Sequence, residues 1–204
     1  MIEEFDKLYQ EVYKENPGNV NPVYHGSQIK EEFILAWNEL IQIISNTKGV
    51  FTFLEVGAYR GLWPLMLSYV CKHLNKEFKY TTITWLDQDP NNQAILKVKE
   101  YYTDNGLEFN LINQNSQLDE TLKFVNNEYD IVFIDADHRY NGVLKDIQLY
   151  SSLATQLLMF HDIRPKTTNP NCGVYQAIQD SNITLDKEIV VNGDIMGIGL
   201  KYVK

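Results

Sequence analysis

The sequence predicts an α/β fold, in which a mainly parallel sheet is covered by helices on both faces. From residue 50 onward, short apolar runs alternate with stretches that carry apolar residues at helical spacing. Parallel strands need crossover helices, and right-handed crossovers place these helices on both faces of the sheet. The last two strand candidates follow each other without a helix, which predicts an antiparallel edge.

The chain has 204 residues, of which 44% are hydrophobic, and is long enough to bury a core of its own. No internal repeat, low-complexity tract or linker interrupts it. We therefore expect a single domain over residues 1–204, in which residues 1–48 form an N-terminal helical cap.

The cap is expected to hold two helices. The first covers 3–14 and is ended by the breaker run Asn16-Pro17-Gly18, and Ser27 is a candidate N-cap for a second helix that ends near Asn46. Strands are predicted at 50–56, 80–86, 109–112, 129–134, 157–160, 188–191 and 198–203. Helices are predicted between them at 64–74, 92–104, 118–125, 140–153 and 175–180.

The charge balance excludes some classes of partner. Asp and Glu number 27 against 18 Lys and Arg, which gives a formal net charge of -9. Nucleic-acid binding needs clustered Lys and Arg to neutralise phosphates, so a small-molecule partner is favoured over nucleic acid. No apolar stretch is long enough to span a membrane, and the N-terminus lacks the features of a signal peptide. We therefore expect a cytoplasmic protein without membrane contacts.

Ligands of an open parallel sheet bind beyond the carboxyl ends of the strands, so these ends are the candidate site. Four of the five ends are acidic. In chain order they carry Glu55, Gly57 and Gly61; Asp87; Asn115 and Ser116; Asp135 and Asp137; and His161 and Asp162.

The end of the first strand argues against a dinucleotide. Tyr59 stands where a Gly-x-Gly-x-x-Gly fingerprint needs its second glycine, and Glu55 would repel a pyrophosphate. An oxidoreductase that uses a dinucleotide is therefore disfavoured. S-adenosylmethionine has no phosphate and carries a sulfonium and an amino group, which suit an acidic rim. The alternative is that the glycines only form a helix-capping loop beside a buried Glu55.

The sequence resembles the class I S-adenosylmethionine-dependent methyltransferases from about Phe51 to its C-terminus. The resemblance includes the run Leu54-Glu55-Val56-Gly57-Ala58-Tyr59-Arg60-Gly61. The segment Phe133-Ile134-Asp135-Ala136-Asp137-His138-Arg139-Tyr140, followed by Phe160-His161-Asp162, is similar to small-molecule and sugar O-methyltransferases and, in layout, to metal-dependent catechol-type enzymes. The resemblance implies a Rossmann-like, doubly wound sheet of seven mostly parallel strands, with an antiparallel C-terminal edge strand.

The resemblance also implies roles for cofactor-binding residues. The loop with Glu55, Gly57, Ala58, Tyr59 and Gly61 would hold the methionine part of the cofactor. Asp87 would bind the ribose beside Gln88, Asn115 and Ser116 would meet the adenine edge, and Asp135 would border the cofactor. The usual Pro-Gly-Gly turn before the fifth strand is replaced here by Ala154-Thr155-Gln156.

The acidic ends of the fourth and fifth strands are candidates for catalysis or metal binding. Asp135, Asp137, His161 and Asp162 are expected to converge, and a divalent cation would relieve the repulsion between their carboxylates. Magnesium prefers the oxygens, whereas His161 favours manganese or iron. Either His138 or His161 could remove a proton from the methyl acceptor. The alternative is that Asp135 and Asp162 only cap helices or turns.

The sequence therefore predicts an S-adenosylmethionine-dependent methyltransferase that O-methylates a small hydroxylated molecule or a sugar, with assistance from magnesium or manganese. A binding module that holds the cofactor without transferring its methyl group is the alternative. The identity of the acceptor and the oligomeric state stay open.

Overall fold

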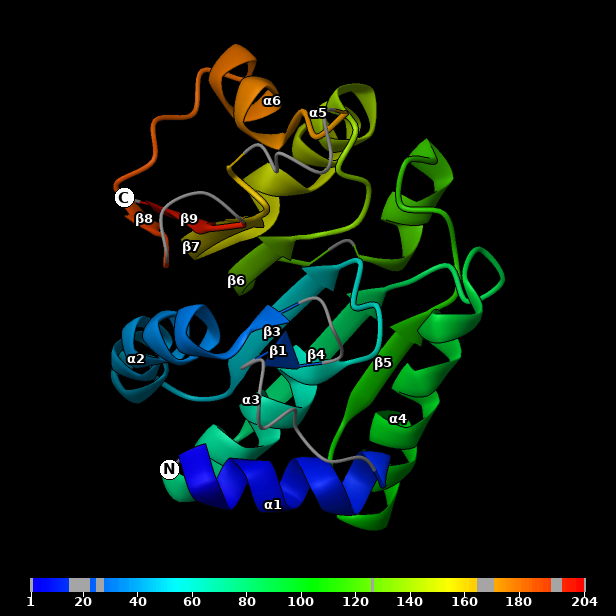
Figure 1. The fold of residues 1–204 in the computed structure, drawn as a ribbon, viewed down its shortest axis with the longest axis vertical. Helices are drawn as coiled ribbons and strands as arrows, with labels where there is room; N and C mark the ends of the chain where they lie inside the picture. The colour runs from blue at the N-terminus through cyan, green and yellow to red at the C-terminus, as the bar shows by residue number, and fades with distance from the viewer. Residues whose placement is uncertain are drawn as a thin grey trace.

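A computed structural model of the protein describes residues 2–14, 23–24, 28–125, 127–164, 171–191 and 196–203 (Figure 1). The helices are α1 (Ile2–Tyr13), α2 (Lys30–Asn46), α3 (Leu62–His73), α4 (Ile95–Asp104), α5 (Tyr140–Tyr150) and α6 (Val174–Asp180). Three short 3-10 helices are η1 (Pro90–Ala94), η2 (Asp119–Phe124) and η3 (Ser151–Leu153). The strands are β1 (Val23–Tyr24), β2 (Gln28–Ile29), β3 (Phe51–Val56), β4 (Phe78–Ile83), β5 (Phe109–Ile112), β6 (Tyr129–Ile134), β7 (Ala154–His161), β8 (Lys187–Ile189) and β9 (Ile198–Tyr202).

Seven strands form one sheet in the order β5-β4-β3-β6-β7-β9-β8. Strands β5, β4, β3, β6 and β7 pair in parallel, and β9 runs antiparallel to both β7 and β8. The sheet thus starts at β3, winds outward to β5, returns to β6 and ends in a reversed hairpin. The predicted fold class, a mostly parallel seven-stranded sheet with an antiparallel strand at its C-terminal edge, is confirmed.

The two faces of the sheet are covered by different helices. Alternate strand residues point to opposite faces, so Phe53 and Phe133 pack against α1, α2, α3 and α4, whereas Leu54 and Val132 pack against α5 and α6. Figure 1 shows α5 and α6 on one side of the sheet and α1 and α3 on the other. The strands are apolar on both faces because both are buried, as in other parallel sheets.

The two N-terminal helices share the larger of these cores. Phe5 of α1 and Phe33 of α2 lie 5.9 Å apart between ring centroids, and Phe33 lies 5.1 Å from Trp63 of α3. Helix α2 ends at Asn46, as predicted. The division of the chain into a cap at 1–48 and the remainder stays a prediction. The predicted breaker run at 16–18 and the Ser27 N-cap lie outside the described residues.

Some predicted element boundaries are wrong, for reasons the structure makes plain. The strand predicted at 80–86 ends at Ile83, because its partners Val56 and Ile112 are the last residues of β3 and β5. The helix predicted at 118–125 is the short 3-10 helix η2. Helix α3 begins at Leu62, two residues before Pro64, which is tolerated because the first turn has no intrahelical partner for its N–H groups.

Among the described residues, no helix combines the length and the apolar character needed to cross a membrane.

Candidate active site

A cavity of about 710 Å³ lies at the carboxyl ends of β3, β4, β5, β6 and β7, where the sequence analysis expects a ligand. Its size is within the usual range for small-molecule sites. The lining residues that were predicted for the site are Glu55, Gly57, Ala58, Tyr59, Gln88, Asn115, Ser116, Asp135, Asp137, His138, His161 and Asp162. Gly61 and Asp87 are not among the residues that line the cavity.

The loop after β3 brings its backbone close to the loop after β6. Gly57 has a φ of +90°, and a Cβ at this position would lie 2.4 Å from the Cα of Ala136. Only glycine fits both the left-handed conformation and this approach. Tyr59 follows with a φ of +46°, which is uncommon for a bulky residue and turns the chain along the cavity wall. The glycine requirement at Gly57 therefore comes from packing at the floor of the cavity.

Gly61 is a glycine for another reason. A Cβ there would lie 2.9 Å from Cγ1 of Ile95, so the residue leaves room for helix α4. Its φ of +84° would also strain any other residue. Its assignment to the cofactor stays a prediction.

Glu55 lies at the end of β3 and lines the cavity, although it is buried. It accepts a hydrogen bond from the hydroxyl of Tyr80 on the neighbouring strand. Burial raises the pKa of Glu55 well above its ordinary value; the Tyr80 bond opposes this rise and the charge of Asp135 adds to it. Strand β3 therefore contributes to the cavity wall a carboxyl group that is harder to ionise than an exposed one.

The loop after β4 places Gln88 and Asp89, rather than Asp87, on the cavity. Asp87 lies exposed in a turn four residues past the end of β4. Asp89 accepts hydrogen bonds from the backbone N–H of Asn91, at 2.8 Å, and from its side chain, at 2.9 Å, and so caps η1. Trp85 also lines the cavity and is 42% exposed. The sequence analysis missed both Asp89 and Trp85.

The loop after β5 is held in place by hydrogen bonds. The side chain of Asn115 accepts the backbone N–H of Gln117 at 3.0 Å, and the carbonyl of Ser116 accepts the hydroxyl of Tyr150 at 2.5 Å. The side chain of Gln117 donates to Asp137 at 3.0 Å. The predicted residues Asn115 and Ser116 thus lie in a fixed loop on the cavity.

The alternation of side chains explains which residues meet beyond β6 and β7. Phe133 and Met159 pair across these two strands and point to the face that α2 covers. Asp135 and His161 lie two residues further along, so they point to the same face, side by side. Asp162, which follows with a φ of +55°, turns its carboxylate toward His138.

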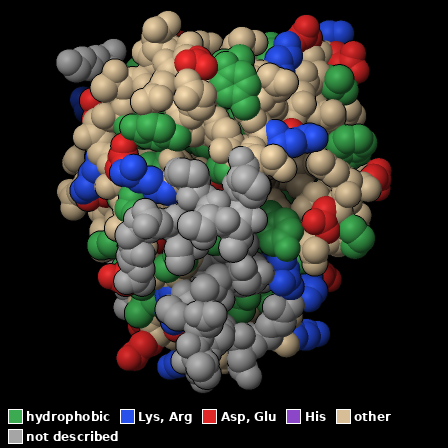
Figure 2. Space-filling view, turned by 45° about the horizontal axis from the view of Figure 1, so that its top comes forward, with side chains coloured by type: hydrophobic (Ala, Val, Ile, Leu, Met, Phe, Trp, Pro, Cys, Tyr) green, Lys and Arg blue, Asp and Glu red, His purple; other side chains and the backbone are tan. Residues whose placement is uncertain are grey.

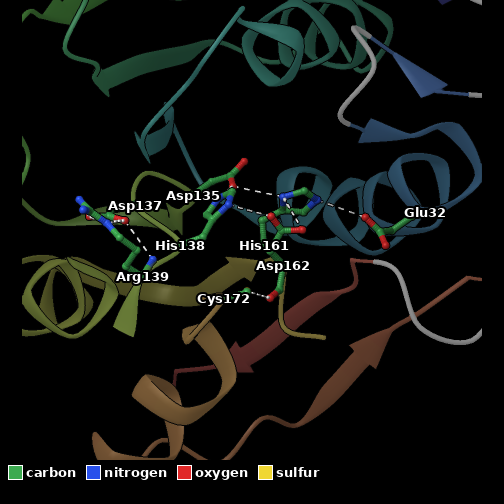
Figure 3. Close-up of polar contacts among 8 residues, drawn as sticks. All are labelled: Glu32, Asp135, Asp137, His138, Arg139, His161, Asp162 and Cys172. Carbon is green, nitrogen blue, oxygen red and sulfur yellow. Dashed lines mark hydrogen bonds and ion pairs between the residues drawn. The ribbon is translucent and has the colours of Figure 1, made fainter. Parts of the chain in front are cut away.

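Two histidines alternate with three carboxylates in this cluster (Figure 3). Glu32 contacts His161 Nε2 at 3.3 Å, and His161 Nδ1 contacts Asp135 Oδ1 at 3.2 Å. The same Asp135 oxygen lies 3.2 Å from His138 Nε2, whose Nδ1 lies 2.9 Å from Asp162 Oδ2. The histidines differ in access, because the side chain of His138 is 33% exposed and that of His161 only 5%.

The carboxylates hold both imidazoles in the charged form. Burial opposes protonation of His138, but hydrogen bonds to Asp135 and Asp162 outweigh it and raise its pKa to about 9. For His161 burial also opposes the charge, and Asp135 and Glu32 raise the pKa well above its ordinary value. The pKa of Asp135 is lowered, because the two imidazoles outweigh the effect of burial.

Asp137 lies apart from the other three predicted metal ligands, and the assignment of Asp135, Asp137, His161 and Asp162 to a metal ion stays a prediction. Beyond β6 the chain is no longer extended, and Asp137 turns away from Asp135 to accept four hydrogen bonds from Arg139, between 2.7 and 3.2 Å (Figure 3). The remaining carboxylates, Asp135 and Asp162, already contact His138. Within the described part of the chain, no group of three or more His, Cys, Asp or Glu side chains is arranged to hold a metal ion.

Glu32 is the member of this cluster that the sequence analysis missed. It lies on α2 within an apolar stripe that includes Ile29, Phe33 and Ala36, and it is fully buried. A carboxylate within such a stripe is the feature that could have drawn attention to it, because a buried charge needs a partner.

Comparison with solved structures identifies the fold class of this chain. The chain superposes on the S-adenosylhomocysteine-bound methyltransferase PaMTH1 of Podospora anserina with a TM-score of 0.59 at 15% identity, covering 98% of this chain and 88% of the other. The O-methyltransferase of Bacillus cereus, in complex with S-adenosylhomocysteine, gives 0.61 at 16% identity and 98% and 91% coverage. The O-methyltransferase NovP gives 0.61 at 10% identity and 100% and 99% coverage. The fold is that of the class I S-adenosylmethionine-dependent methyltransferases.

The sequence itself gives the family. A family model described as a methyltransferase domain matches residues 54–163, more than half of the chain. The chain belongs to this methyltransferase family. No curated protein matches it in sequence.

Proposed function

We propose that the protein is an S-adenosylmethionine-dependent methyltransferase that O-methylates a small hydroxylated molecule or a sugar, with His138 as the base. One observation carries this proposal. His138 lies on the wall of the same cavity as the loop after β3, and two carboxylates flank its ring at 2.9 and 3.2 Å. A base needs both access to the acceptor and a group that orients it.

The chemistry of the cavity suits S-adenosylmethionine. Its walls carry five carboxyl groups, and one of its two arginines, Arg139, is already paired with Asp137. The two histidines and two arginines balance most of these carboxyl charges, so the cavity has no positive excess that would favour a phosphate over a sulfonium and an amino group. Glu55, Gly57, Ala58 and Tyr59 would border the methionine part. The adenosine would lie between the loop of Gln88 and Asp89 and that of Asn115 and Ser116.

When bound, S-adenosylmethionine supplies an electrophilic methyl group. The acceptor hydroxyl displaces Asp135 from Nε2 of His138, because this contact is longer than that of Nδ1 with Asp162. His138 would first lose its Nε2 proton to solvent, and the neutral Nε2 could then take the proton of the hydroxyl, whose oxygen would receive the methyl group that the cofactor supplies as its sulfonium becomes a thioether. Asp162 keeps the ring oriented through Nδ1 and stabilises the imidazolium, as the acidic partner of a catalytic histidine does.

His161 and Asp135 have supporting roles in this proposal. Both nitrogens of His161 face carboxylates, and its side chain is almost fully buried, so it is poorly placed to reach an acceptor. The positive charge of His161 lies against Asp135. His161 therefore still pairs with this carboxylate when His138 separates from it. The predicted catalytic set of His138, His161 and Asp135 is thus divided into one base and two residues that act through it.

Metal assistance does not fit the contacts of this cluster. Asp135 and Asp162 are both paired with His138, so a divalent ion would have to compete with a charged imidazole for these carboxylates. The charge that would attract the ion is already balanced by two imidazoles. We therefore derive no step through a metal ion.

The charge distribution supports a small acceptor over a nucleic acid. On the face drawn in Figure 2, the described Lys and Arg side chains lie scattered among Asp and Glu side chains. The formal net charge of the chain is -9, and the described Lys and Arg side chains form no continuous basic surface for phosphates on that face.

The test begins with calorimetric titration of the protein with S-adenosylmethionine. A panel of sugars, phenols and other small alcohols is then assayed for release of S-adenosylhomocysteine, with His138→Gln as the comparison. We expect binding by both proteins and turnover by the wild type alone. Binding without turnover of any acceptor would favour the non-catalytic module, and failure of the wild type to bind would refute the proposal as a whole.

A further inference from the structure

Glu32 occupies a position where a carboxylate is stabilised only by specific partners. It is fully buried on the apolar face of α2, and removing a carboxylate from water without partners is strongly unfavourable. It also lies outside residues 54–163, which the methyltransferase family model covers. Helix α2, which directly precedes the first strand of the seven-stranded sheet, therefore adds a charged group to a cluster that otherwise comes from the strand ends.

Both oxygens of Glu32 have partners in the site. Oε1 contacts His161 Nε2 at 3.3 Å, and Oε2 accepts the backbone N–H of Gly197 at 2.8 Å. In Figure 3 the Glu32 side chain reaches from α2 toward the His161 ring, on the side opposite Asp135. His161 is thus held between two carboxylates, and the ring orientation that presents Nδ1 to Asp135 is the one that presents Nε2 to Glu32.

The contact with Gly197 links Oε2 of Glu32 to the part of the cluster that contains Asp162. Gly197 has a φ of +89°, and a Cβ there would lie 2.9 Å from Cγ1 of Ile163, so its backbone packs closely against that residue. Its carbonyl accepts the backbone N–H of Ile163 at 3.3 Å. Ile163 follows Asp162, the residue that orients His138. One carboxylate therefore supports His161 directly and the Asp162 turn through Gly197.

We propose that Glu32 is a positioning residue for methyl transfer: it fixes the His161 ring against Asp135, which leaves His138 available to the acceptor. Without Glu32, the His161 ring is free to turn away, and Asp135 then keeps His138 as its only cationic partner. His138 would then stay in contact with Asp135 and would not become available to the acceptor. This inference rests on the proposed function, because it assigns His138 to the reaction.

The matched comparison is Glu32→Gln against Glu39→Gln. Glu39 lies on the same helix, but its partners Lys187 and Tyr202 are at the surface, away from the cluster. For both variants we would measure the dissociation constant of S-adenosylmethionine, the melting temperature, and kcat and KM for the acceptor found in the screen. We expect Glu32→Gln to lower kcat about 10- to 100-fold, as loss of a residue that orients a ligating or catalytic histidine does, with KM and cofactor affinity within about 2-fold. Glu39→Gln should match the wild type.

Proton NMR of the imidazole N–H groups tests the contact without any turnover. A His161 ring proton assigned with His161→Gln should exchange slowly with water, unlike that of His73, whose side chain is 52% exposed. The resonance should shift or disappear in Glu32→Gln and persist in Glu39→Gln. Fast exchange of the assigned His161 proton in the wild type would overturn the contact, whatever the stability of Glu32→Gln.

The outcomes separate this inference from the proposed function. Unchanged kcat in a folded Glu32→Gln protein, while His138→Gln is inactive, overturns the positioning role and leaves the proposed function in place. Absence of turnover by the wild type on the whole panel refutes the proposed function. The NMR result then decides the Glu32–His161 contact alone.

Discussion

Nδ1 of His138 lies 2.9 Å from a carboxylate oxygen of Asp162, and this contact joins the loop after β6 to the turn after β7. Asp162 is almost fully buried and has a left-handed backbone, whereas His138 is partly exposed to the cavity. A buried acid behind an accessible imidazole is the arrangement of an oriented base.

Substitution of either partner should separate catalysis from cofactor binding. His138→Gln and Asp162→Asn should lower kcat by about 10²- to 10⁴-fold, the usual contribution of general acid–base catalysis. Neither side chain lies in the loops assigned to the cofactor, so its dissociation constant should stay within about 3-fold. Steady-state kinetics with calorimetry would measure both quantities, and a large loss of cofactor affinity with unchanged kcat would contradict the assignment.

The pH dependence should report His138. Its pKa is raised to about 9 by Asp135 and Asp162, against the effect of burial. A base must be neutral to accept a proton, and only about one in a hundred His138 side chains is neutral at pH 7. The rate should therefore rise as pH increases and level off near pH 9. In Asp162→Asn the residual rate should level off at lower pH, because one of the carboxylates that raise the pKa is lost.

Substitution of Asp89 and substitution of Asp87 should have different effects on the affinity for S-adenosylmethionine. The resemblance assigns the ribose to Asp87, but Asp89 lines the cavity and Asp87 lies exposed in a turn. Asp89→Asn keeps an oxygen to cap η1 and loses the charge, so affinity for S-adenosylmethionine should fall about 10-fold. Asp87→Asn should change it less than about 2-fold. Calorimetry on the two variants decides between them, and the reverse order would restore the prediction from sequence.

Chelation tests the disagreement over a metal ion. Because His138 and His161 balance Asp135 and Asp162, incubation with EDTA followed by dialysis should leave kcat within about 2-fold of its starting value. Addition of magnesium or manganese should not raise it. Loss of activity that either metal restores would show that an ion competes with His138 for Asp135 and Asp162 and that the metal hypothesis from sequence was correct.

The sequence predicts the sheet better than it predicts the site. The strands at 109–112 and 129–134 have the predicted bounds, because each is an apolar run and its pairing with neighbouring strands matches that run. Strand β4 stops before its apolar run does, since the neighbouring strands end there. The local sequence pattern of one strand contains no information about where the neighbouring strand ends.

The candidate site residues also differ in how well the sequence predicts their positions. Glu55, Asp135 and His161 follow from the period of two along each strand. The positions of Asp137 and Asp87 depend on the conformation of the loops after β6 and β4. A change of backbone conformation at one residue of such a loop redirects the side chains that follow it. Glu32 meets His161 across 129 positions of the chain, and only the packing of α2 on the sheet brings them together.

The last prediction concerns Asp146, a fully buried carboxyl on α5 beside the loop of Ser116. Burial raises its pKa from 3.8 to about 7, and the charge of Asp137 adds to this rise. Between these two values the folded state binds more protons than the unfolded state, so this residue makes the free energy of unfolding fall as pH rises from about 4 to 7. Asp146→Asn removes the titration, and relative to the wild type it should gain about 1–3 kcal/mol of stability at pH 8 compared with pH 5. Urea denaturation at the two pH values measures this difference. Asp119→Asn, at an exposed carboxyl that pairs with Lys145, provides the control, and an equal effect of pH on both variants would contradict the raised pKa.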